Sequence, residues 1–329
     1  MASEFSIVIP AFNRERFIAA AMESALGQTL PADAIIVVDD GSTDRTGEIV
    51  GRYGPPVRLI RIENNGAGPS RPRNVGIEAA RSKYITLLDS DDRLEPTVLE
   101  RHRAVFTKCP QAGLIGNQWK MAELIDGKLC NWREKFIFAV DPLSITEIFP
   151  ATYLIPSAIA YEAYCGPNHL RPTGASLPRQ VWAEIGGFDE GLRTSEDYDF
   201  FLRIIKRRDI VFIDIPLGLV VRHDRNLSAA HPGRVNDIRV LERELSCSSN
   251  PRITERLRHH LQDIYAGLGY QYRNARQYRL AISAYGKYRA YGGGFRFYWE
   301  AIAKLAVHRC LTGLRLRRQV AGGDHPGSE

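Results

Sequence analysis

The sequence predicts an α/β protein in which a mixed, mostly parallel sheet carries helices on both faces, followed by a C-terminal helical appendage. Strand-like and helix-like segments alternate along the first half of the chain, which is the pattern of a parallel sheet with crossover helices. The strand-like segments show no polar alternation, as strands covered on both faces require. From about residue 235 the pattern is helical throughout.

The early strands and helices are predicted from apolar patterns. Each strand is a short run rich in β-branched or aromatic residues, and the strands span residues 5–10, 34–38, 57–62 and 84–88. Three helices are expected between them. They cover residues 15–28, with an apolar stripe at helical spacing, a segment after Ser42, and residues 74–80 behind a Gly/Pro-rich loop.

Beyond Pro96 the regular alternation is lost. Residues 110–180 mix short apolar runs with Pro, Gly and Asn, which predicts long loops over an irregular sheet. Helices are then expected from Pro178 and from about Ser195, and closing strands at residues 211–213 and 219–221. The expected division is an α/β domain over 1–232, a helical region over 233–320 and a disordered tail over 321–329.

The composition is that of a soluble globular protein, with 44% hydrophobic and 25% charged residues among 329. No apolar run approaches the roughly 20 residues that span a bilayer. The N-terminus does not resemble a signal peptide, because Glu4 precedes a strand-like segment that Pro10 ends. The five cysteines are scattered without metal-ligand spacing, and free thiols favour a cytoplasmic location.

The net charge of +6 is uneven, because arginines recur from Arg252 onward. Such a segment could face nucleic acid or an anionic membrane. A solvated helical face is the commoner explanation, so no nucleic-acid partner is expected.

The most informative stretch is the acidic loop Asp89, Ser90, Asp91 and Asp92, which directly follows the strand expected at 84–88. In open α/β sheets, ligands bind at the carboxyl ends of the strands. Carboxylates this close repel one another unless a cation neutralises them, and hard oxygen ligands suit Mg²⁺ or Mn²⁺ together with phosphate oxygens. An isolated sequence of this kind would more often be a polar turn.

The other strands end in polar loops as well, and this favours a nucleotide site over an isolated turn. The first strand runs into Pro10, Ala11, Phe12 and Asn13. The second ends in Asp39 and Asp40, which could accept hydrogen bonds from a base or ribose, before a flexible Gly41. After the third strand, a glycine-containing turn and two guanidinium groups suit a diphosphate. That loop contains Asn64, Gly66, Gly68, Arg71, Arg73 and Asn74.

In this order, the segments Pro-Ala-Phe-Asn, Asp-Asp-Gly-Ser-Thr-Asp, Arg-Asn-x-Gly and Asp-Ser-Asp-Asp resemble the nucleotide-sugar-binding half of glycosyltransferase family 2. Members of this family have the GT-A fold and invert the anomeric centre. The resemblance covers residues 5–95 and resumes at 186–190 and 195–199, which look like the family's acceptor-side segment.

The resemblance implies roles for particular residues. Asp39 or Asp40 would hold the base, usually uracil. Asp89 and Asp91 would form the DxD pair at the ribose and an Mn²⁺ or Mg²⁺ ion, and His223 would reach the metal or the diphosphate. Further contacts to the nucleotide-sugar are expected from Pro10, Ala11, Phe12, Asn13, Gly68, Arg73, Ser90 and Glu196.

Asp197 would be the catalytic base. Displacing a nucleoside diphosphate needs a cation at the leaving group and one carboxylate that takes the proton of the attacking hydroxyl. Glu196 and Asp199 compete for this role, and helix N-terminal acidity alone could explain all three.

The resulting hypothesis is a metal-dependent inverting transferase that moves one hexose or N-acetylhexosamine from a UDP-linked donor to a glycan, lipid-linked or other hydroxyl acceptor. The chain lacks the Gln-x-x-Arg-Trp motif and membrane helices of processive members, so it resembles a non-processive enzyme. A sugar-1-phosphate nucleotidyltransferase would need an early Gly-rich loop, and residues 10–14 contain no glycine. A non-catalytic binding protein would not need both acidic clusters.

The C-terminal helices carry an aromatic stripe that resembles one tetratricopeptide-like helix pair. We expect the stripe to need a partner surface, either in a homodimer or at the inner face of an anionic membrane. Its members are Tyr265, Tyr272, Tyr278, Tyr285 and Tyr288.

Overall fold

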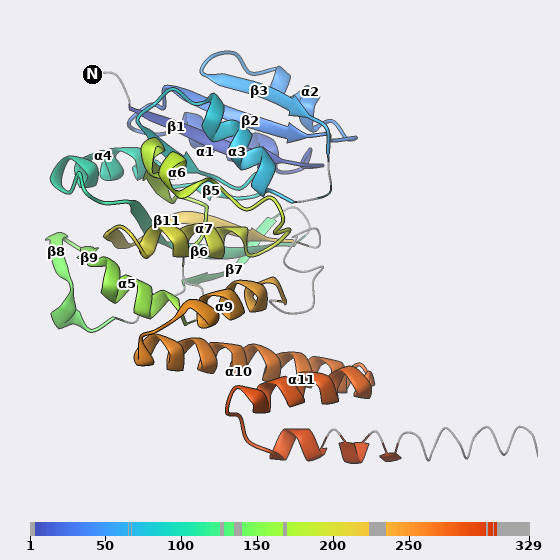
Figure 1. Ribbon diagram of the computed structural model, residues 1–329. Helices are drawn as coiled ribbons and strands as arrows, with labels where there is room; N and C mark the ends of the chain where they lie inside the picture. The colour runs from blue at the N-terminus through green and yellow to red at the C-terminus, as the bar shows by residue number, and fades with distance from the viewer. Residues whose placement is uncertain are drawn as a thin grey trace, which may run out of the picture. The chain divides into compact units, whose positions relative to one another are not determined.

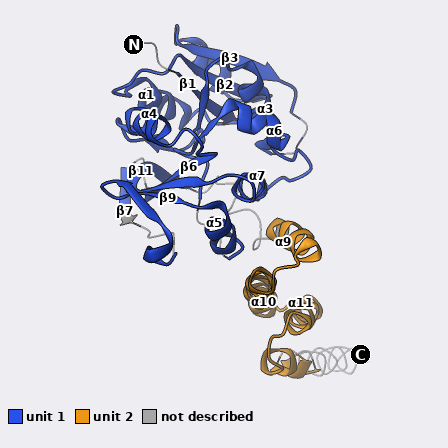
Figure 2. Cartoon of the chain, turned by 60° about the vertical axis from the view of Figure 1, so that its left-hand side comes forward, with its two compact units in different colours: residues 1–230 blue, residues 231–329 orange. Residues whose placement is uncertain are grey.

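The computed structural model describes residues 4–64, 66, 68–125, 128–134, 140–166, 170–223, 235–300, 302–304 and 306–307. Two compact units, Met1–Ala230 and His231–Glu329, are distinguished in Figure 2. The tail expected at 321–329 lies outside the described residues, as does Cys310.

The alternation expected in the first half of the chain is confirmed. Its elements are β1 (Phe5–Ala11), α1 (Ile18–Leu26), β2 (Ala34–Asp40), α2 (Thr46–Gly51), β3 (Val57–Ile62), α3 (Ser70–Ala79) and β4 (Tyr84–Leu87). Helix α1 begins later than expected, because Phe17 and Ile18 donate to the Arg14 carbonyl in a preceding turn. Helix α3 begins earlier than expected and includes Pro72. Proline is tolerated there, because backbone N–H groups in the first turn of a helix have no acceptor within the helix.

The strands form one sheet in the order β3-β2-β1-β4-β10-β6-β11-β9-β8 (Figure 1). Strands β1, β2, β3 and β4 are parallel, as predicted. Strand β10 (Ser176–Pro178) is antiparallel to both β4 and β6 (Leu114–Ile125), and so joins the two halves of the sheet.

Both faces of the sheet are covered, which explains the apolar strands. In β1, Phe5, Ile7 and Ile9 belong to a core cluster with residues of α1 and α4 (Val98–Lys108). On the opposite face, α3 packs closely on β1, because a Cβ atom on Gly76 would lie 2.5 Å from a methyl group of Val8.

The expectation of long loops over residues 110–180 is wrong for most of that segment. It contains β6, β7 (Lys128–Glu134), a 3₁₀ turn (Pro142–Ser144), β8 (Thr146–Phe149), β9 (Thr152–Ile155), α5 (Ser157–Tyr164) and β10. The short strand β5 (Arg93–Leu94) and α4 precede it.

The two closing strands expected at 211–213 and 219–221 are one strand, β11 (Ile210–Arg222), parallel to β6. The register of its pairing with β6 shifts around Pro216. Because proline cannot donate a hydrogen bond to the neighbouring strand, the sequence pattern suggested that the strand ended there. Helices α6 (Arg179–Ile185) and α7 (Glu196–Ile205) lie where they were expected, with Gly186 ending α6 in the left-handed conformation.

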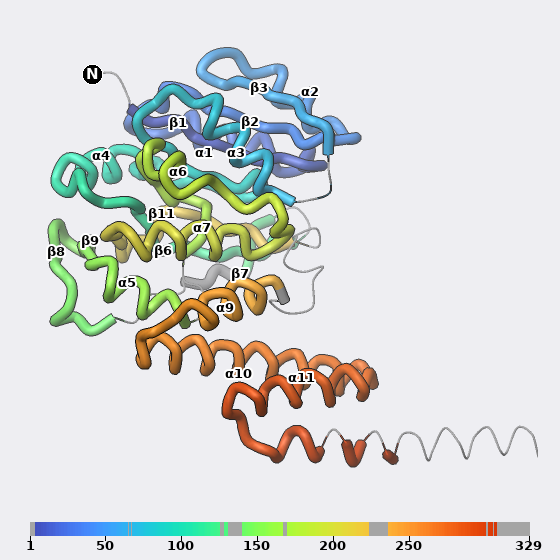
Figure 3. Tube along the Cα trace, viewed as in Figure 1, coloured from blue at the N-terminus to red at the C-terminus, as the bar shows by residue number. Residues whose placement is uncertain are grey.

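The second unit contains α9 (Val235–Cys247), α10 (Pro251–Asn274) and α11 (Tyr278–Ala290). Asn250 caps α10 by accepting from the N–H groups of Arg252 and Ile253. Helices α10 and α11 lie side by side (Figure 3), and Tyr285 packs on Gly269 with only 1% of its surface exposed.

Of the five tyrosines of the aromatic stripe, Tyr285 alone is buried, and part of the remaining packing comes from α9 and from the residues after α11. Tyr265 stacks on Tyr291, and both hydroxyls donate to Glu242. Tyr272, Tyr278 and Tyr288 are partly buried. Self-association and membrane contact stay predictions. In the part of the chain that the structure describes, no helix is long and apolar enough to cross a membrane.

Candidate active site

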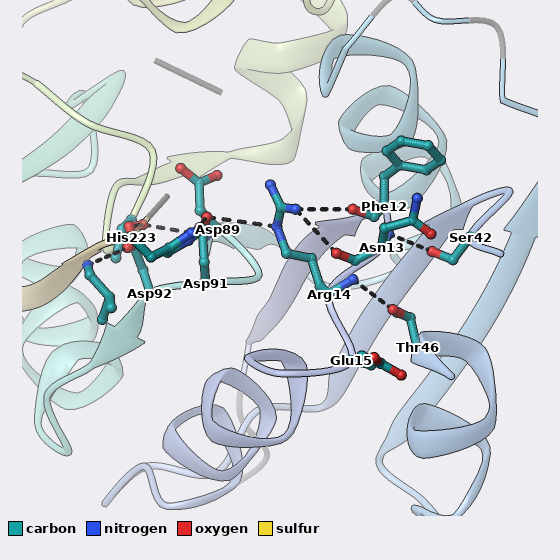
Figure 4. Close-up of polar contacts among 12 residues, drawn as sticks. Phe12, Asn13, Arg14, Glu15, Ser42, Thr46, Asp89, Asp91, Asp92 and His223 are labelled. Carbon is teal, nitrogen blue, oxygen red and sulfur yellow. Dashed lines mark hydrogen bonds and ion pairs between the residues drawn. The ribbon is translucent and has the colours of Figure 1, made fainter. Parts of the chain in front are cut away.

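The candidate site lies at the carboxyl edge of β1, β2 and β4, where the parallel strands bring their loops together (Figure 4). The loop after β1 is tied to the loop after β2. Asn13 donates its N–H to Ser42 Oγ at 2.9 Å, and its side chain accepts from the Thr43 N–H at 2.9 Å. Phe12 remains 44% exposed beside these ties, while Pro10 and Ala11 are buried in β1.

Each of the two carboxylates at the end of β2 has one buried oxygen without a hydrogen-bond partner among the described residues, Oδ2 of Asp39 and Oδ1 of Asp40. Asp39 accepts from the Ser42 N–H at 3.0 Å, and its other oxygen lies 3.3 Å from Nε of Arg61. One oxygen of Asp40 accepts from Asn64 Nδ2, whereas the buried Oδ1 has no hydrogen-bond partner among the described residues. Burial raises the pKa of Asp40, although the charge of Arg71 opposes this. Asp40 therefore retains an unused buried acceptor.

Asp91 faces His223, which follows β11 (Figure 4). The distance from His223 Nε2 to Asp91 Oδ2 is 3.0 Å, and Nε of Arg14 lies 3.7 Å from the same oxygen. Burial alone would raise the pKa of Asp91, but the hydrogen bond from His223 and the charge of Arg14 lower it overall. The His223 ring stacks on Phe17 at 4.1 Å between centroids.

Asp92 holds the acidic loop to the rest of the sheet. Its two oxygens accept from Thr173 Oγ1 at 2.6 Å and from the Val221 N–H at 2.9 Å. Burial, with the charges of Asp91 and Asp89, raises its pKa well above the ordinary value. Ser90 is buried in the same loop. Asp92 thus has a supporting role, and Asp89 and Asp91 are the members of the loop available to a ligand.

Arg73 links the acidic loop to α7. Its guanidinium donates at 2.6 Å to Asp89 Oδ1 and at 2.6 Å to Glu196 Oε1, and it lies 5.3 Å from the centroid of the Phe188 ring. The side chain is 3% exposed. The two carboxylates raise its pKa further despite the burial. Arg73 therefore holds the acidic loop and the start of α7 together. Arg71 has no such role, because it donates to the Glu63 backbone carbonyl at 2.8 Å.

The acidic start of α7 presents three carboxylates in different environments. Glu196 is bound by Arg73, and burial, with the charge of Asp197, raises its pKa to about 7. Asp199 is fully buried and paired with Arg203 at 2.7 Å. Asp197 makes no ion pair with any described residue, and its side chain accepts from the Tyr198 N–H at 2.8 Å.

Burial raises the pKa of Asp197, and the nearby charges of Arg73 and Arg171 only partly offset this. A raised pKa suits a carboxylate that must accept a proton. Among the three competing candidates, the geometry therefore favours Asp197 as the base.

Sequence reasoning missed the supporting role of Asn74, a member of the Arg-Asn-x-Gly segment. Its side chain accepts from the Phe188 N–H at 2.8 Å and from Trp182 Nε1, and donates to the Phe188 carbonyl and to Glu190. Gly187 is left-handed and approaches Asn74 so closely that a Cβ atom would clash with Oδ1. This clamp fixes the segment that leads into α7.

Gly68 has a similar packing role. Its φ is +87°, and a Cβ atom there would lie 2.6 Å from the Arg193 carbonyl oxygen. Thr173 had no signal in the sequence, because it lies in an irregular segment far from the acidic loop that it contacts.

The donor types fit a hard divalent cation, because Asp89, Asp91 and His223 offer carboxylate oxygens and an imidazole nitrogen. Within the described residues, however, no group of three or more His, Cys, Asp and Glu side chains is arranged to hold a metal ion. The repulsion within the acidic loop is also relieved by the protein itself, since Arg73 pairs with Asp89, and Arg14 and His223 pair with Asp91. The expectation of Mn²⁺ or Mg²⁺ therefore depends on donor chemistry and stays a prediction.

The fold and the site define a glycosyltransferase of the GT-A type. The chain is similar to the crystal structure of S. aureus TarS 1–349 in complex with UDP-GlcNAc, with a TM-score of 0.64 and 20% identity over 92% of this chain and 88% of that one. The family model for glycosyl transferase family 2 matches residues 6–123.

The chain belongs to glycosyl transferase family 2. It is 34% identical over 230 residues to glycosyltransferase GlyG of Streptococcus pneumoniae, covering 69% of this chain and 73% of that protein. It is 35% identical over 204 residues to the poly(ribitol-phosphate) beta-N-acetylglucosaminyltransferase TarS of Staphylococcus aureus. That match covers 61% of this chain but 32% of TarS.

Proposed function

We propose that this glycosyltransferase is metal-dependent and inverting, and that it moves one sugar from a UDP-linked donor to a hydroxyl of its acceptor. The observation that carries the proposal is the double contact of Arg73 with Asp89 and Glu196, at 2.6 Å each. This contact brings the loop after β4 and the start of α7, with Asp197, into one site. Donor binding and proton removal can then occur side by side.

The nucleotide would lie across the ends of β1 and β2. Asp39 and Asp40 each have a buried oxygen without a hydrogen-bond partner that suits the N–H of a uracil ring. Asp40 is preferred, because the oxygen of Asp39 already lies 3.3 Å from Nε of Arg61. The exposed ring of Phe12 offers an apolar face beside this position. UDP-GlcNAc is the first donor to test, because TarS has been crystallised with it and is named a beta-N-acetylglucosaminyltransferase.

Asp89, Asp91 and His223 would hold Mn²⁺ or Mg²⁺, which would supply charge stabilisation for the departing UDP. Asp91 is well suited, because its lowered pKa keeps the carboxylate ionised at neutral pH. The buried pair of Arg73 with Asp89 would hold the other carboxylate in place.

Asp197 would take the proton of the acceptor hydroxyl as that oxygen attacks the anomeric carbon from the face opposite the UDP. A diphosphate leaves without being protonated, so no second carboxylic acid is needed, unlike in an inverting hydrolase. Glu196 and Asp199 are each held by an arginine, which leaves Asp197 for this step.

The acceptor would be a glycan, a lipid-linked saccharide or another hydroxyl compound. A cytoplasmic enzyme, peripheral at the inner face of the membrane or dimeric through its C-terminal helices, is the arrangement that we propose for access to such an acceptor. The exposed Phe295 and Trp299 beside Arg296 support an exposed contact surface in the second unit.

A screen of UDP release tests the proposal. Purified enzyme would be incubated with Mn²⁺ and UDP-GlcNAc, UDP-glucose or UDP-galactose, and UDP measured with and without candidate acceptors. Asp197→Asn should lose on the order of 10²–10⁴ in transfer rate. Asp141→Asn, at the exposed start of the 3₁₀ turn, is the matched control and should keep wild-type turnover. Equal turnover in wild type and Asp197→Asn would refute the assignment of the base.

A further inference from the structure

The segment 170–175, between α5 and β10, is fixed against the acidic loop. Leu170 is buried on Gly116 of β6, where a Cβ atom would lie 2.4 Å from its Cδ2. Thr173 donates to Asp92 at 2.6 Å and accepts from the Asp89 N–H, and the Gly174 N–H donates to the Leu87 carbonyl at 2.9 Å. These contacts give Arg171, which lies among them, a defined position relative to the candidate site.

The guanidinium of Arg171 stacks on Trp119 of β6, with Cζ 4.6 Å from the ring centroid. Trp119 is 4% exposed, whereas Arg171 is only partly buried. A guanidinium at this distance from an indole face is attracted by the ring, and its N–H groups remain available to an anion in one plane.

Unlike Arg14, Arg73 and Arg203, Arg171 forms no ion pair with a described residue. Arg14 pairs with Asp91, Arg73 with Asp89 and Glu196, and Arg203 with Asp199. No carboxylate in the described part of the chain lies within ion-pair distance of Arg171.

Thr173, two residues after Arg171, contacts Asp92 and the Asp89 N–H, which places this segment beside the candidate site. The positive charge of Arg171 is also one of the influences that lower the pKa of the Asp197 carboxyl. The acceptor hydroxyl must reach Asp197 to give up its proton. The neighbouring part of the acceptor therefore comes within reach of Arg171.

We propose that Arg171 binds an anionic group of the acceptor, a phosphate or a carboxylate, next to the hydroxyl that receives the sugar. This inference rests on the proposed function and adds the chemical class of the acceptor. A planar guanidinium pairs with either anion through two parallel N–H···O bonds. Phosphate and carboxylate share this chemistry, so the test includes both.

The test uses three probes with the same carbon skeleton: glycerol, glycerate and glycerol 3-phosphate. Each is titrated calorimetrically into the full-length enzyme saturated with UDP and Mg²⁺, so that the diphosphate position is already filled. The variants are Arg171→Ala, Arg171→Lys and the control Arg193→Ala, which removes an exposed arginine from the segment before α7.

We expect one or both anionic probes to bind and glycerol not to bind. Arg171→Ala should weaken anion binding at least tenfold, about 1.4 kcal/mol. The anion affinity of Arg171→Lys should lie between those of the wild type and Arg171→Ala, because lysine keeps the positive charge but lacks the planar guanidinium. Arg193→Ala should bind like wild type.

The inference is overturned if no anionic probe binds, or if glycerol binds as tightly as the anions. It is also overturned if Arg193→Ala weakens anion binding as much as Arg171→Ala does. UDP binding is measured in every variant and shows that the fold is intact. If UDP does not bind the wild-type enzyme at all, the proposed function fails. If UDP binds and the anions do not, only the role of Arg171 fails.

Discussion

Arg73→Ala is the substitution with the largest consequence expected from the structure. It removes a guanidinium that is 3% exposed and leaves the carboxylates of Asp89 and Glu196 without their partner. Removing one member of a buried ion pair typically costs about 3–5 kcal/mol, because a charge remains buried without compensation. Asp89 is 30% exposed and can hydrate, so we expect about 3 kcal/mol, near the lower limit of that range.

The loss of unfolding free energy caused by Arg73→Ala should depend on pH. The direction of this dependence follows from the pKa of Glu196. Its pKa is already raised to about 7 with Arg73 present, and loss of the arginine raises it further, because Arg73 lowers it. The folded variant therefore binds more protons than the folded wild type around neutral pH. Stability then falls more steeply with pH in the variant, and the cost of Arg73→Ala should be greater at pH 8 than at pH 6.

Urea unfolding followed by tryptophan fluorescence measures this cost, since Trp119 and Trp182 lie in the first unit. Arg52→Ala is the matched control, because Arg52 pairs with Glu48 at the surface, with the two side chains 68% and 57% exposed. An exposed pair of this kind contributes about 0–0.5 kcal/mol. A cost below about 1 kcal/mol for Arg73→Ala, or the same cost as Arg52→Ala, would refute the reasoning.

Three further outcomes follow from the site. Asp91→Asn should lose Mn²⁺-dependent UDP binding in calorimetry while its circular dichroism stays native; unchanged metal dependence would remove Asp91 from the ligand set. The kcat/KM of the wild type should fall as pH drops through the raised pKa of Asp197, because only the carboxylate accepts a proton, and an acid limb at or below an ordinary Asp pKa of 3.8 would contradict the burial argument. Asn74→Ala should increase proteolysis near Gly186 and Gly187, since it removes the four hydrogen bonds of the clamp; native resistance would show that the clamp is dispensable.

The strands and the acidic loop were predictable because their signals are local. An apolar run followed directly by Asp89 and Asp91 gives both the strand and the position of its loop at the carboxyl edge. The family resemblance predicted that Asp197 belongs to the same site, although it lies more than 100 residues further along the chain.

What the sequence could not predict depends on tertiary contacts. Pro216 interrupts the apolar pattern of β11, but the strand continues through a register shift that only its pairing with β6 stabilises. The contacts of Thr173 and Asn74 could not be predicted, because their partners lie far away in the chain. The bridge that Arg73 forms between Asp89 and Glu196 is likewise a tertiary contact that only the folded arrangement reveals.

Calorimetric titration of UDP, with and without Mn²⁺, tests the central claim most directly when wild type, Asp91→Asn and Asp197→Asn are compared. We predict metal-dependent binding in wild type and in Asp197→Asn, since a base is not needed to bind UDP, and its loss in Asp91→Asn. Absence of UDP binding to wild type with Mn²⁺ present, or binding that is equal with and without the metal in all three proteins, would contradict a metal-dependent UDP-sugar transferase.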